Sequence, residues 1–218
     1  MGPPFIEPKV TIYSIAMTSP EAGRRRGRPR KEGLPEHLLL HTLQVLLRDG
    51  HDSFNMNAVA QSASTSKETL YRHFRDKAGL LGAALDHLGK TVEPLLLEGI
   101  HDGLAQPLLL RRLAENYLRG CLRPESLALQ RMAYVEAGKD LGKIFARQFT
   151  NAALEVVTRE FSRLATPDPK LDAEVFLAMV QGQLHERALL GVASVPNSKK
   201  IHEVTAHAVK VFSKYLGG

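Results

Sequence analysis

The 218-residue chain contains a single cysteine, Cys121, and no apolar run approaching the roughly 18 to 20 residues that cross a membrane as a helix. A lone thiol excludes an internal disulfide, which fits a reducing compartment. Its neighbours Leu118 and Leu122 predict a buried structural role for it. Residues 1–23 lack the charged start and long apolar middle of a secretory signal. These absences predict a cytoplasmic protein with no membrane segment.

A catalytic constellation is also missing. No set of titratable residues converges at the spacing of an active site, so we expect the protein not to be an enzyme. His37 and His41 stand one helical turn apart, but no third ligand with a telling spacing accompanies them. His185 and Glu186 fit a polar contact between helices better than catalysis. We expect neither a cofactor nor a metal.

The alternation of apolar and polar residues that marks a strand persists nowhere in the sequence. From Leu34 onward, leucine, alanine and valine instead recur at intervals of three and four residues, which predicts an all-α fold. We expect helices over about residues 34–50, 55–63, 66–74, 76–94, 108–122, 124–137, 139–164, 171–190 and 198–216. Residues 1–32, which are rich in proline and show no helical period, are expected to be disordered, and Met17 is an alternative to Met1 as the start of translation.

Positive charge is concentrated in the first third of the chain. The formal net charge is +6 and the pI is near 9.5. Residues 1–82 carry 12 Lys or Arg against 8 Asp or Glu, and the run RRRGRPRK at 24–31 contains no acid. Such an excess favours an acidic partner such as nucleic acid or an anionic membrane surface.

The segment SKETLYRHFRDK, residues 66–77, offers only Leu70 and Phe74 as large apolar anchors for one helix face. Its remaining residues form a face rich in hydrogen-bond donors, while Tyr71 and His73 are expected at the surface. A second short helix, with Asn55 as its cap, precedes it by three or four residues. Two short helices so joined are the sequence form of a helix-turn-helix.

Residues 54–81, FNMNAVAQSASTSKETLYRHFRDKAGLL, resemble the DNA-binding domain of the TetR family of transcriptional regulators. In that family a Val-Ala or Ile-Ala pair precedes the turn, and a Thr-Leu-Tyr-x-His-Phe-x-x-Lys segment follows it. The family's Gly-Val in the turn is Ser64-Thr65 here. Because glycine relieves the cost of a positive backbone angle, we expect either a mildly strained positive φ at Ser64 or a slightly different turn. Residues 107–216 resemble the C-terminal domain of the AefR-like branch through LRPESLALQRMAYVEAGKDLGKIF and AEVFLAMVQGQLHERALLG.

The resemblance implies an N-terminal three-helix DNA-binding domain, residues 33–80, and a C-terminal effector-binding and dimerisation domain, residues 81–218. It further implies a homodimer formed through residues 171–190 and 198–216. Such a dimer would bind a palindromic double-stranded DNA operator with half-sites about one helical turn, roughly 34 to 36 Å, or a multiple of it apart. A small-molecule effector bound among the middle helices would release a repressor of this kind from DNA.

On the DNA, Lys67, Glu68 and Thr69 would meet base edges, whereas Tyr71, His73 and Lys77 would contact phosphate. Arg28 and Arg30, in a stretch that resembles an AT-hook, would enter the minor groove or simply attract phosphate. The full set of expected DNA-binding residues is Arg28, Arg30, Asn55, Ser66, Lys67, Glu68, Thr69, Tyr71, Arg72, His73 and Lys77. A solvated helix face is the alternative for Lys67, Glu68, Tyr71, Arg72 and Lys77, and His73 could equally be a hydrogen-bonded structural histidine.

For the effector pocket we expect apolar walls with a few polar anchors. The candidates are Tyr117, Met132, Tyr134, Glu136, Phe145, Phe149, Phe176, Met179 and Gln183, each of which could instead be a core residue. The sequence also leaves open a DNA-binding interaction or architectural protein of the same fold that is controlled by a protein partner instead of a ligand.

Overall fold

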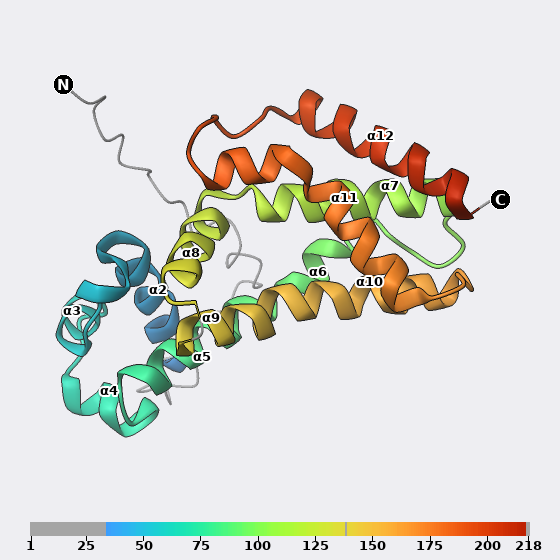
Figure 1. The fold of residues 1–218 in the computed structure, drawn as a ribbon. Helices are drawn as coiled ribbons and strands as arrows, with labels where there is room; N and C mark the ends of the chain where they lie inside the picture. The colour runs from blue at the N-terminus through green and yellow to red at the C-terminus, as the bar shows by residue number, and fades with distance from the viewer. Residues whose placement is uncertain (1–33, 138, 217–218) are drawn as a thin grey trace, which may run out of the picture. The chain divides into compact units, whose positions relative to one another are not determined.

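The computed structural model describes residues 34–137 and 139–216, and within these ranges the regular structure is helical (Figure 1). The first four helices are α2 (Leu34–Ser53), α3 (Met56–Ser62), α4 (Lys67–Phe74) and α5 (Lys77–Gly89). The remaining elements are α6 (Val92–Leu96), α7 (Gln106–Cys121), α8 (Pro124–Val135), α9 (Asp140–Phe145), the π-helix η1 (Ala146–Asn151), α10 (Ala152–Arg163), α11 (Pro169–Leu189) and α12 (Ser198–Leu216). The all-α fold expected from the sequence is confirmed. No helix within these ranges is long and apolar enough to cross a membrane.

The chain forms two compact units, one up to His87 and the other from Leu88 onward, so the division falls near the end of α5. In the first unit α2 packs against α3, and α3 against α4, and buried apolar residues of α2, α3, α4 and α5 make a small leucine-rich core. Its fully buried members include Leu38, Leu46, Val59, Leu70 and Leu80. Gly50, with φ 76°, breaks the helical geometry of α2, and one further turn follows to Ser53.

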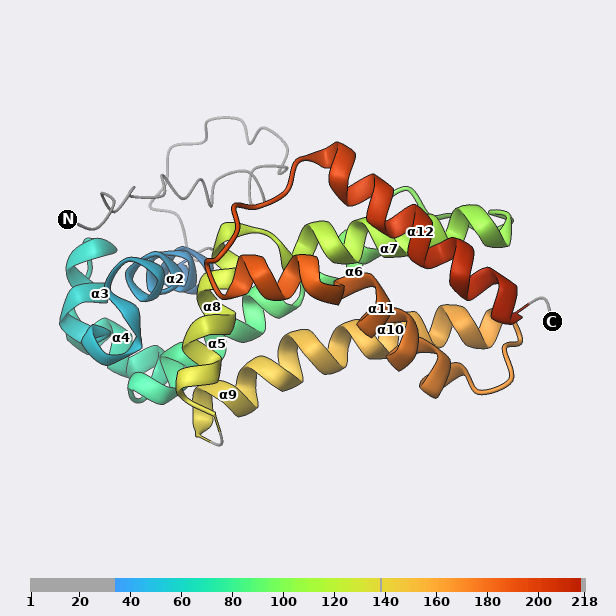
Figure 2. The same ribbon diagram turned by 45° about the horizontal axis from the view of Figure 1, so that its top comes forward.

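The second unit is a bundle in which α7, α10, α11 and α12 share one apolar core. Phe161, Phe176 and Phe212 meet at its centre, with ring centroids 5.2 to 5.5 Å apart. In both ribbon views α12 runs along α7 (Figures 1 and 2). Since each ring comes from a different helix, the stack joins α10, α11 and α12.

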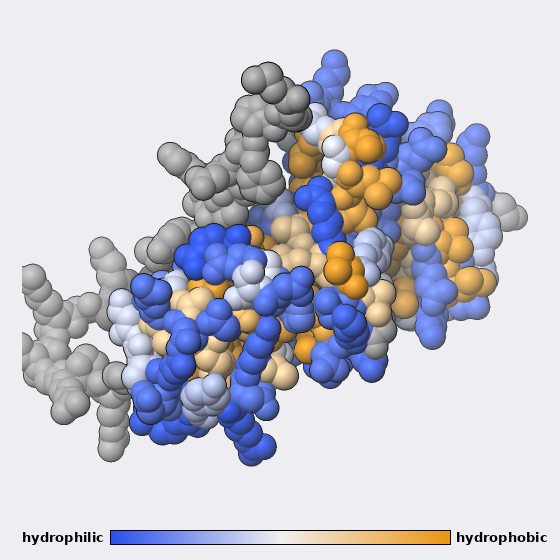
Figure 3. Space-filling model, turned by 60° about the vertical axis from the view of Figure 1, so that its left-hand side comes forward, coloured by the Kyte–Doolittle hydropathy of each residue, from blue (hydrophilic) through white to orange (hydrophobic). Residues whose placement is uncertain are grey.

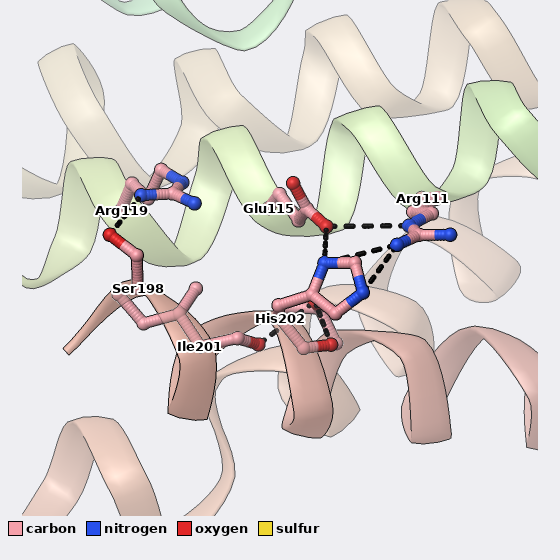
Figure 4. A network of polar contacts seen from close by, with 7 residues as sticks. Arg111, Glu115, Arg119, Ser198, Ile201 and His202 are labelled. Atoms are coloured by element: carbon pink, nitrogen blue, oxygen red, sulfur yellow. Dashed lines mark hydrogen bonds and ion pairs between the residues drawn. The ribbon is translucent and has the colours of Figure 1, made fainter. Parts of the chain in front are cut away.

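Polar contacts also join α7 to α12 (Figure 4). His202 Nδ1 lies 2.8 Å from Glu115 Oε1, and the guanidinium of Arg111 contacts the same ring. A ring that donates its Nδ1 proton to Glu115 can accept from Arg111 at Nε2. One turn further along α7, Arg119 donates to the hydroxyl of Ser198 at 3.2 Å.

One sequence prediction about a helix end is wrong. The helix predicted over 76–94 is shorter, since α5 ends at Gly89, and Thr91 Oγ1 donates to the carbonyl of Leu88 at 2.7 Å. Pro94 is the third residue of α6, where a helical N–H has no partner inside the helix and its loss costs little. The helix predicted over 139–164 is present as α9, η1 and α10, which follow one another without a gap, and the helix predicted over 171–190 is α11, whose helical geometry breaks at Gly182, with φ 46°.

Candidate nucleic-acid interface

Side-chain caps define the start of the two short helices in the first unit. Asn55 Oδ1 accepts from the N–H of Ala58 at 3.0 Å, and Ser66 Oγ accepts from the N–H of Thr69 at 3.2 Å. Each bond satisfies an N–H that the helix itself leaves without an acceptor. The predicted cap at Asn55 is confirmed, and Ser66 caps α4 in the same way, so the side chains of Asn55 and Ser66 are already used within the protein.

The turn between α3 and α4 reverses the chain at Ser64, whose φ is 48°. The N–H of Thr65 donates to the carbonyl of Ala60 at 2.9 Å and closes the turn. The sequence prediction of a positive φ at this position is therefore confirmed. A residue with a Cβ is strained in this region by about 1 to 2 kcal/mol, so the turn is maintained by the packing of α3 and α4 on the core.

Helix α4 divides into an apolar and a polar side. Leu70 is fully buried and Phe74 is half-buried. The side chains that reach solvent are all polar or aromatic: Lys67, Glu68, Tyr71, Arg72 and His73. Thr69 is half-buried, and its hydroxyl lies 3.1 Å from Ser66 Oγ. The expected exposed face is thus present, and Tyr71 and His73 lie on it as predicted.

Glu68 sits in the first turn of α4, where it is fully exposed. Hydrogen bonds from its own backbone N–H and from the Ser66 hydroxyl lower the pKa of its carboxyl. It is therefore an anion at neutral pH, which suits a hydrogen bond from a cytosine amino group but not contact with phosphate.

Lys77, expected to contact phosphate, makes two contacts within its own unit. Its Nζ donates to the carbonyl oxygen of His51 at 3.3 Å and lies 5.5 Å from the centroid of the Phe54 ring. A carbonyl partner at the end of α2 and an aromatic face both stabilise an ammonium. Lys77 thereby connects the end of α2 to the first residue of α5.

Between α4 and α5 the chain turns at Arg75, which has φ 67° and ψ −55°. The N–H of Asp76 donates to the carbonyl of Phe74 at 2.8 Å, which makes this a γ-turn of the rare, strained kind. Asp76 Oδ1 then accepts from the N–H of Gly79 at 2.7 Å and caps α5. A Cβ at Gly79 would overlap the Phe74 carbonyl oxygen, so this corner requires glycine there.

Sequence reasoning missed Arg75, although its side chain is exposed beside the polar face of α4. The available signal was the short connection, because only two residues separate the two helices, and with Asp76 as the cap the other one must reverse the chain. Arg28 and Arg30, by contrast, lie outside the described residues.

The effector-pocket candidates fall in several environments of the second unit. Phe145 and Phe149 are half-buried, with ring centroids 4.9 Å apart, and η1 carries the second of them. Phe176 lies in the aromatic core, and Glu136 pairs with Lys139 at 3.3 Å. Tyr134 and Gln183 are exposed, whereas Met132 and Met179 are half-buried.

Tyr117 belongs to a group of uncharged polar side chains contributed by α7 and α11. Burial raises the pKa of its phenol, and burial raises the pKa of the Cys121 thiol to about 11. Gln181 Nε2 approaches Cys121 Sγ at 3.8 Å. The thiol is therefore half-buried, stays protonated at neutral pH and is not a nucleophile.

His185 links α11 to α8, where its Nε2 lies 2.9 Å from Gln130 Oε1. Burial lowers the pKa of its imidazole, so the ring is neutral at pH 7. The predicted contact between helices is confirmed, and the partner is α8 of the same chain.

Two protein-family models match this chain. Residues 38–84 match the model of the bacterial regulatory proteins of the tetR family, and residues 109–215 match that of the AefR-like transcriptional repressor C-terminal domain. The two matches cover about two thirds of the chain. The chain belongs to the TetR family of transcriptional regulators.

Individual relatives agree with this assignment. The TetR-family chain is 55% identical over 49 residues to the DNA-binding transcriptional repressor TetR of Mycobacteroides abscessus, an overlap of 22% of this chain and 26% of that relative. The chain thus spans about a quarter of that relative's length. TetR-family regulators are not enzymes, which confirms the sequence prediction on this point.

Two solved structures share the fold. One is a chain from Mesorhizobium loti MAFF303099 described as a TetR-family transcriptional regulator, with a TM-score of 0.78 and 20% identity over 86% of this chain and 98% of that one. The other is the flavonoid-responsive regulator FrrA, with a TM-score of 0.66 and 24% identity over 84% of this chain and 96% of that one.

Proposed function

We propose that this TetR-family protein is a ligand-responsive repressor that binds a palindromic operator as a homodimer through α4 and is released by a small-molecule effector. The observation that carries the proposal is the composition of α4, because buried Leu70 anchors a helix whose exposed residues are polar or aromatic. A helix of this kind fits the major groove and presents its first residues to base edges.

The leading residues of α4 have the chemistry for base recognition. Lys67 is exposed and can donate to guanine O6 or N7, and anionic Glu68 can accept from a cytosine amino group. Tyr71 and His73 follow on the exposed face and would donate to phosphate. Arg28 and Arg30 would add minor-groove or phosphate contacts beside the site that α4 recognises.

A second copy of the chain is the proposed partner of α11 and α12. Several large apolar residues of these helices point to solvent, and Leu171 and Val175 on α11 and Val211 and Tyr215 on α12 are each about half exposed. Each pair is spaced by one helical turn, so each helix presents an apolar stripe. Apolar areas also reach the surface on the face drawn in Figure 3. Exposed apolar surface of this kind favours a protein partner.

Much of the apolar surface that the sequence assigned to this partner is buried within the protein itself. Phe176 and Val180 on α11, and Ile201, Ala208 and Phe212 on α12, all belong to the core of the second unit. The proposed homodimer contact through residues 171–190 and 198–216 therefore depends on the exposed apolar residues of α11 and α12 named above.

For the effector, we propose a site among α7, α9, η1 and α11. The Phe145–Phe149 pair offers aromatic walls, and Tyr117, Gln181 and Cys121 offer uncharged hydrogen-bonding groups: Gln181 is an amide, and burial raises the pKa of the Tyr117 phenol and of the Cys121 thiol. These groups favour an uncharged aromatic or apolar effector over an ionic one. That FrrA, a structural neighbour, is flavonoid-responsive supports this class of ligand.

The test begins with selection of bound fragments from genomic DNA by the purified full chain. We expect a palindromic site, a shifted band in a gel assay at moderate ionic strength, and a dimer at micromolar concentration in sedimentation. Absence of a preferred site, or a monomer only, would contradict the proposal. A screen of uncharged aromatic metabolites by thermal shift then tests the effector, since a ligand that binds the folded state raises Tm. If no ligand is found and a specific protein co-purifies, control by a protein partner replaces effector control.

A further inference from the structure

We propose that the two cations flanking Asp76 have different tasks in DNA binding: Arg75 contacts DNA phosphate, whereas Lys77 is a positioning residue that fixes the end of α2 against the start of α5. This inference rests on the proposed operator binding by α4. It departs from the sequence-based expectation, in which Lys77 supplies the phosphate contact and Arg75 has no assigned role.

The contacts of Lys77 support a positioning role. Its ammonium donates to the His51 carbonyl and lies against the Phe54 ring, and its side chain is half-buried. The N-terminus of α5 next to it is already occupied, because the Asp76 carboxylate accepts from the N–H of Gly79. A phosphate at this position would meet that carboxylate, and to bind Lys77 it would have to compete with the carbonyl and the ring.

Arg75, in contrast to Lys77, lies in an open environment. Its side chain is exposed, and its guanidinium makes no hydrogen bond or ion pair with any residue that the structure describes. Its backbone lies in a region that glycine adopts without strain, yet the residue is an arginine. Strained residues cluster at functional sites, and this one lies beside the face of α4 that we propose to bind DNA. Arginine offers a planar set of donors suited to a phosphate oxygen pair.

The dependence of operator affinity on salt concentration distinguishes a phosphate contact from a positioning role. Each phosphate contact that a protein makes contributes about 0.9 to the slope of log K against log salt, so a dimer that loses one contact per copy loses about two units. A residue that only positions the helix changes the affinity without changing this slope. Stability provides an independent readout, because the Lys77 contacts belong to the fold and the Arg75 side chain adds none.

The experiment uses the full chain and the operator selected by the wild type, with affinity measured by fluorescence anisotropy between about 50 and 200 mM salt. Arg75→Gly is expected to weaken binding at least about fivefold and to reduce the slope by about two units. Its Tm should equal or exceed that of the wild type, because glycine removes the Cβ strain. Arg75→Lys should keep the slope. Should Arg75→Gly destabilise the turn, Arg75→Asn removes the cation while tolerating a positive φ.

Lys77→Met keeps the unbranched stem but removes the ammonium. We expect a lower Tm and a weaker operator complex, with an unchanged salt slope at a temperature where every variant is folded. Lys77→Arg, which can donate to the same carbonyl, should recover part of the affinity. Lys143→Ala, which removes an exposed cation from α9, serves as the control and should leave the slope and the affinity unchanged.

The outcomes are distinguishable from failure of the proposed function. If the wild type shows no operator preference, operator binding itself is refuted. If the wild type binds but Arg75→Gly retains its slope, or if Lys77→Met loses about two units of slope at unchanged Tm, the assignment of tasks is overturned while operator binding stands.

Discussion

The hydroxyl of Tyr215 on α12 donates a hydrogen bond to Oδ1 of Asp172 on α11 at 2.9 Å, although the tyrosine is 57% exposed and the aspartate is buried. The other carboxylate oxygen of Asp172 accepts from the N–H of Asp168 at 3.2 Å. The bond therefore joins α11 to α12 through a buried carboxylate that accepts from Tyr215 and from the Asp168 N–H. The same bond raises the pKa of the Tyr215 hydroxyl.

Replacement of this hydroxyl should be measurable as a loss of stability. We expect Tyr215→Phe to lower the free energy of unfolding by about 1 to 2 kcal/mol, because Asp172 stays buried with one donor fewer. Urea denaturation monitored by circular dichroism provides the measurement. The matched control is Tyr134→Phe, whose hydroxyl is exposed and makes only a 3.5 Å contact with Gln130. Equal effects of both variants would contradict the role of the bond.

Close approach of backbone predicts opposite effects of two glycine substitutions. A Cβ at Gly142 would lie 2.9 Å from the carbonyl oxygen of Glu136 and 3.2 Å from that of Ala133, so α9 could no longer approach the end of α8. We expect Gly142→Ala to cost about 1 to 3 kcal/mol. Gly120→Ala meets no atom within 4 Å and should stabilise α7 by up to about 1 kcal/mol. Thermal unfolding of the two variants in parallel tests the contrast, and similar shifts in Tm would refute it.

Base recognition by α4 predicts a sequence-dependent effect of Lys67. Lys67→Ala should weaken operator binding by about 1 to 3 kcal/mol and relax the preference at one base pair. Because the side chain is exposed, Tm should not change. Binding to a set of operators with single substitutions measures the preference. A loss of equal size on every duplex would show that Lys67 contacts only phosphate.

The basic run before α2 predicts a change in salt dependence. Deletion of residues 1–32 should weaken operator binding and flatten the slope of log K against log salt, because six cations of the run at 24–31 are removed. A full-length variant with Ala at Arg28 and Arg30 isolates the two arginines expected in the minor groove. An unchanged slope after the deletion would exclude the run from the complex.

Buried histidines predict a loss of stability in acid. The pKa of His185 in the folded state lies below its ordinary value of 6.5 because of burial, and the pKa of His41 is lowered by burial and by His37. The unfolded chain therefore binds protons more readily, so the free energy of unfolding should fall as the pH drops below about 6.5, until the folded-state pKa values are passed. Above about pH 7.5, where these histidines have lost their protons in the unfolded chain as well, they should contribute no pH dependence.

His185→Gln should remove part of this dependence, since glutamine can still bond to Gln130 but does not titrate. Denaturation at several pH values between about 5 and 8 provides the measurement. His101→Gln, a change at an exposed loop residue, is the control and should leave the dependence intact. A pH profile that is identical in His185→Gln and the wild type would contradict the assignment.

The local chemistry of the first unit was predictable from sequence because each signal acts over a few residues. Asn55 and Ser66 cap their helices through N–H groups three residues on, and Ser64 takes the positive φ that the turn demands. The burial of Leu70 and the exposure of Tyr71 follow from a helical period alone. These features required no knowledge of distant residues.

What the sequence could not show depends on partners far along the chain. The carbonyl of His51 that holds Lys77 lies 26 residues before it, and no periodic pattern encodes that contact. Helix α5 ends at Gly89, where a Cβ would crowd Gln148 of η1. Pro94, the strongest local signal nearby, proved compatible with the start of another helix. Phe176 looked suited to a pocket, but its ring belongs to the aromatic core.

The π-helix at Ala146–Asn151 lies within the continuous helical segment from Asp140 to Arg163, and it is the position in that segment where one residue can be gained or lost. A π-turn accommodates one residue more than an α-turn. The helices before and after it therefore keep their own buried faces, and only the rotation of one face relative to the other about the helix axis changes. Removal of one residue from this segment would restore a regular helix. Natural insertions and deletions in relatives of this chain are therefore expected to concentrate here rather than in α10, where a single-residue change would rotate Val157 and Phe161 out of the core.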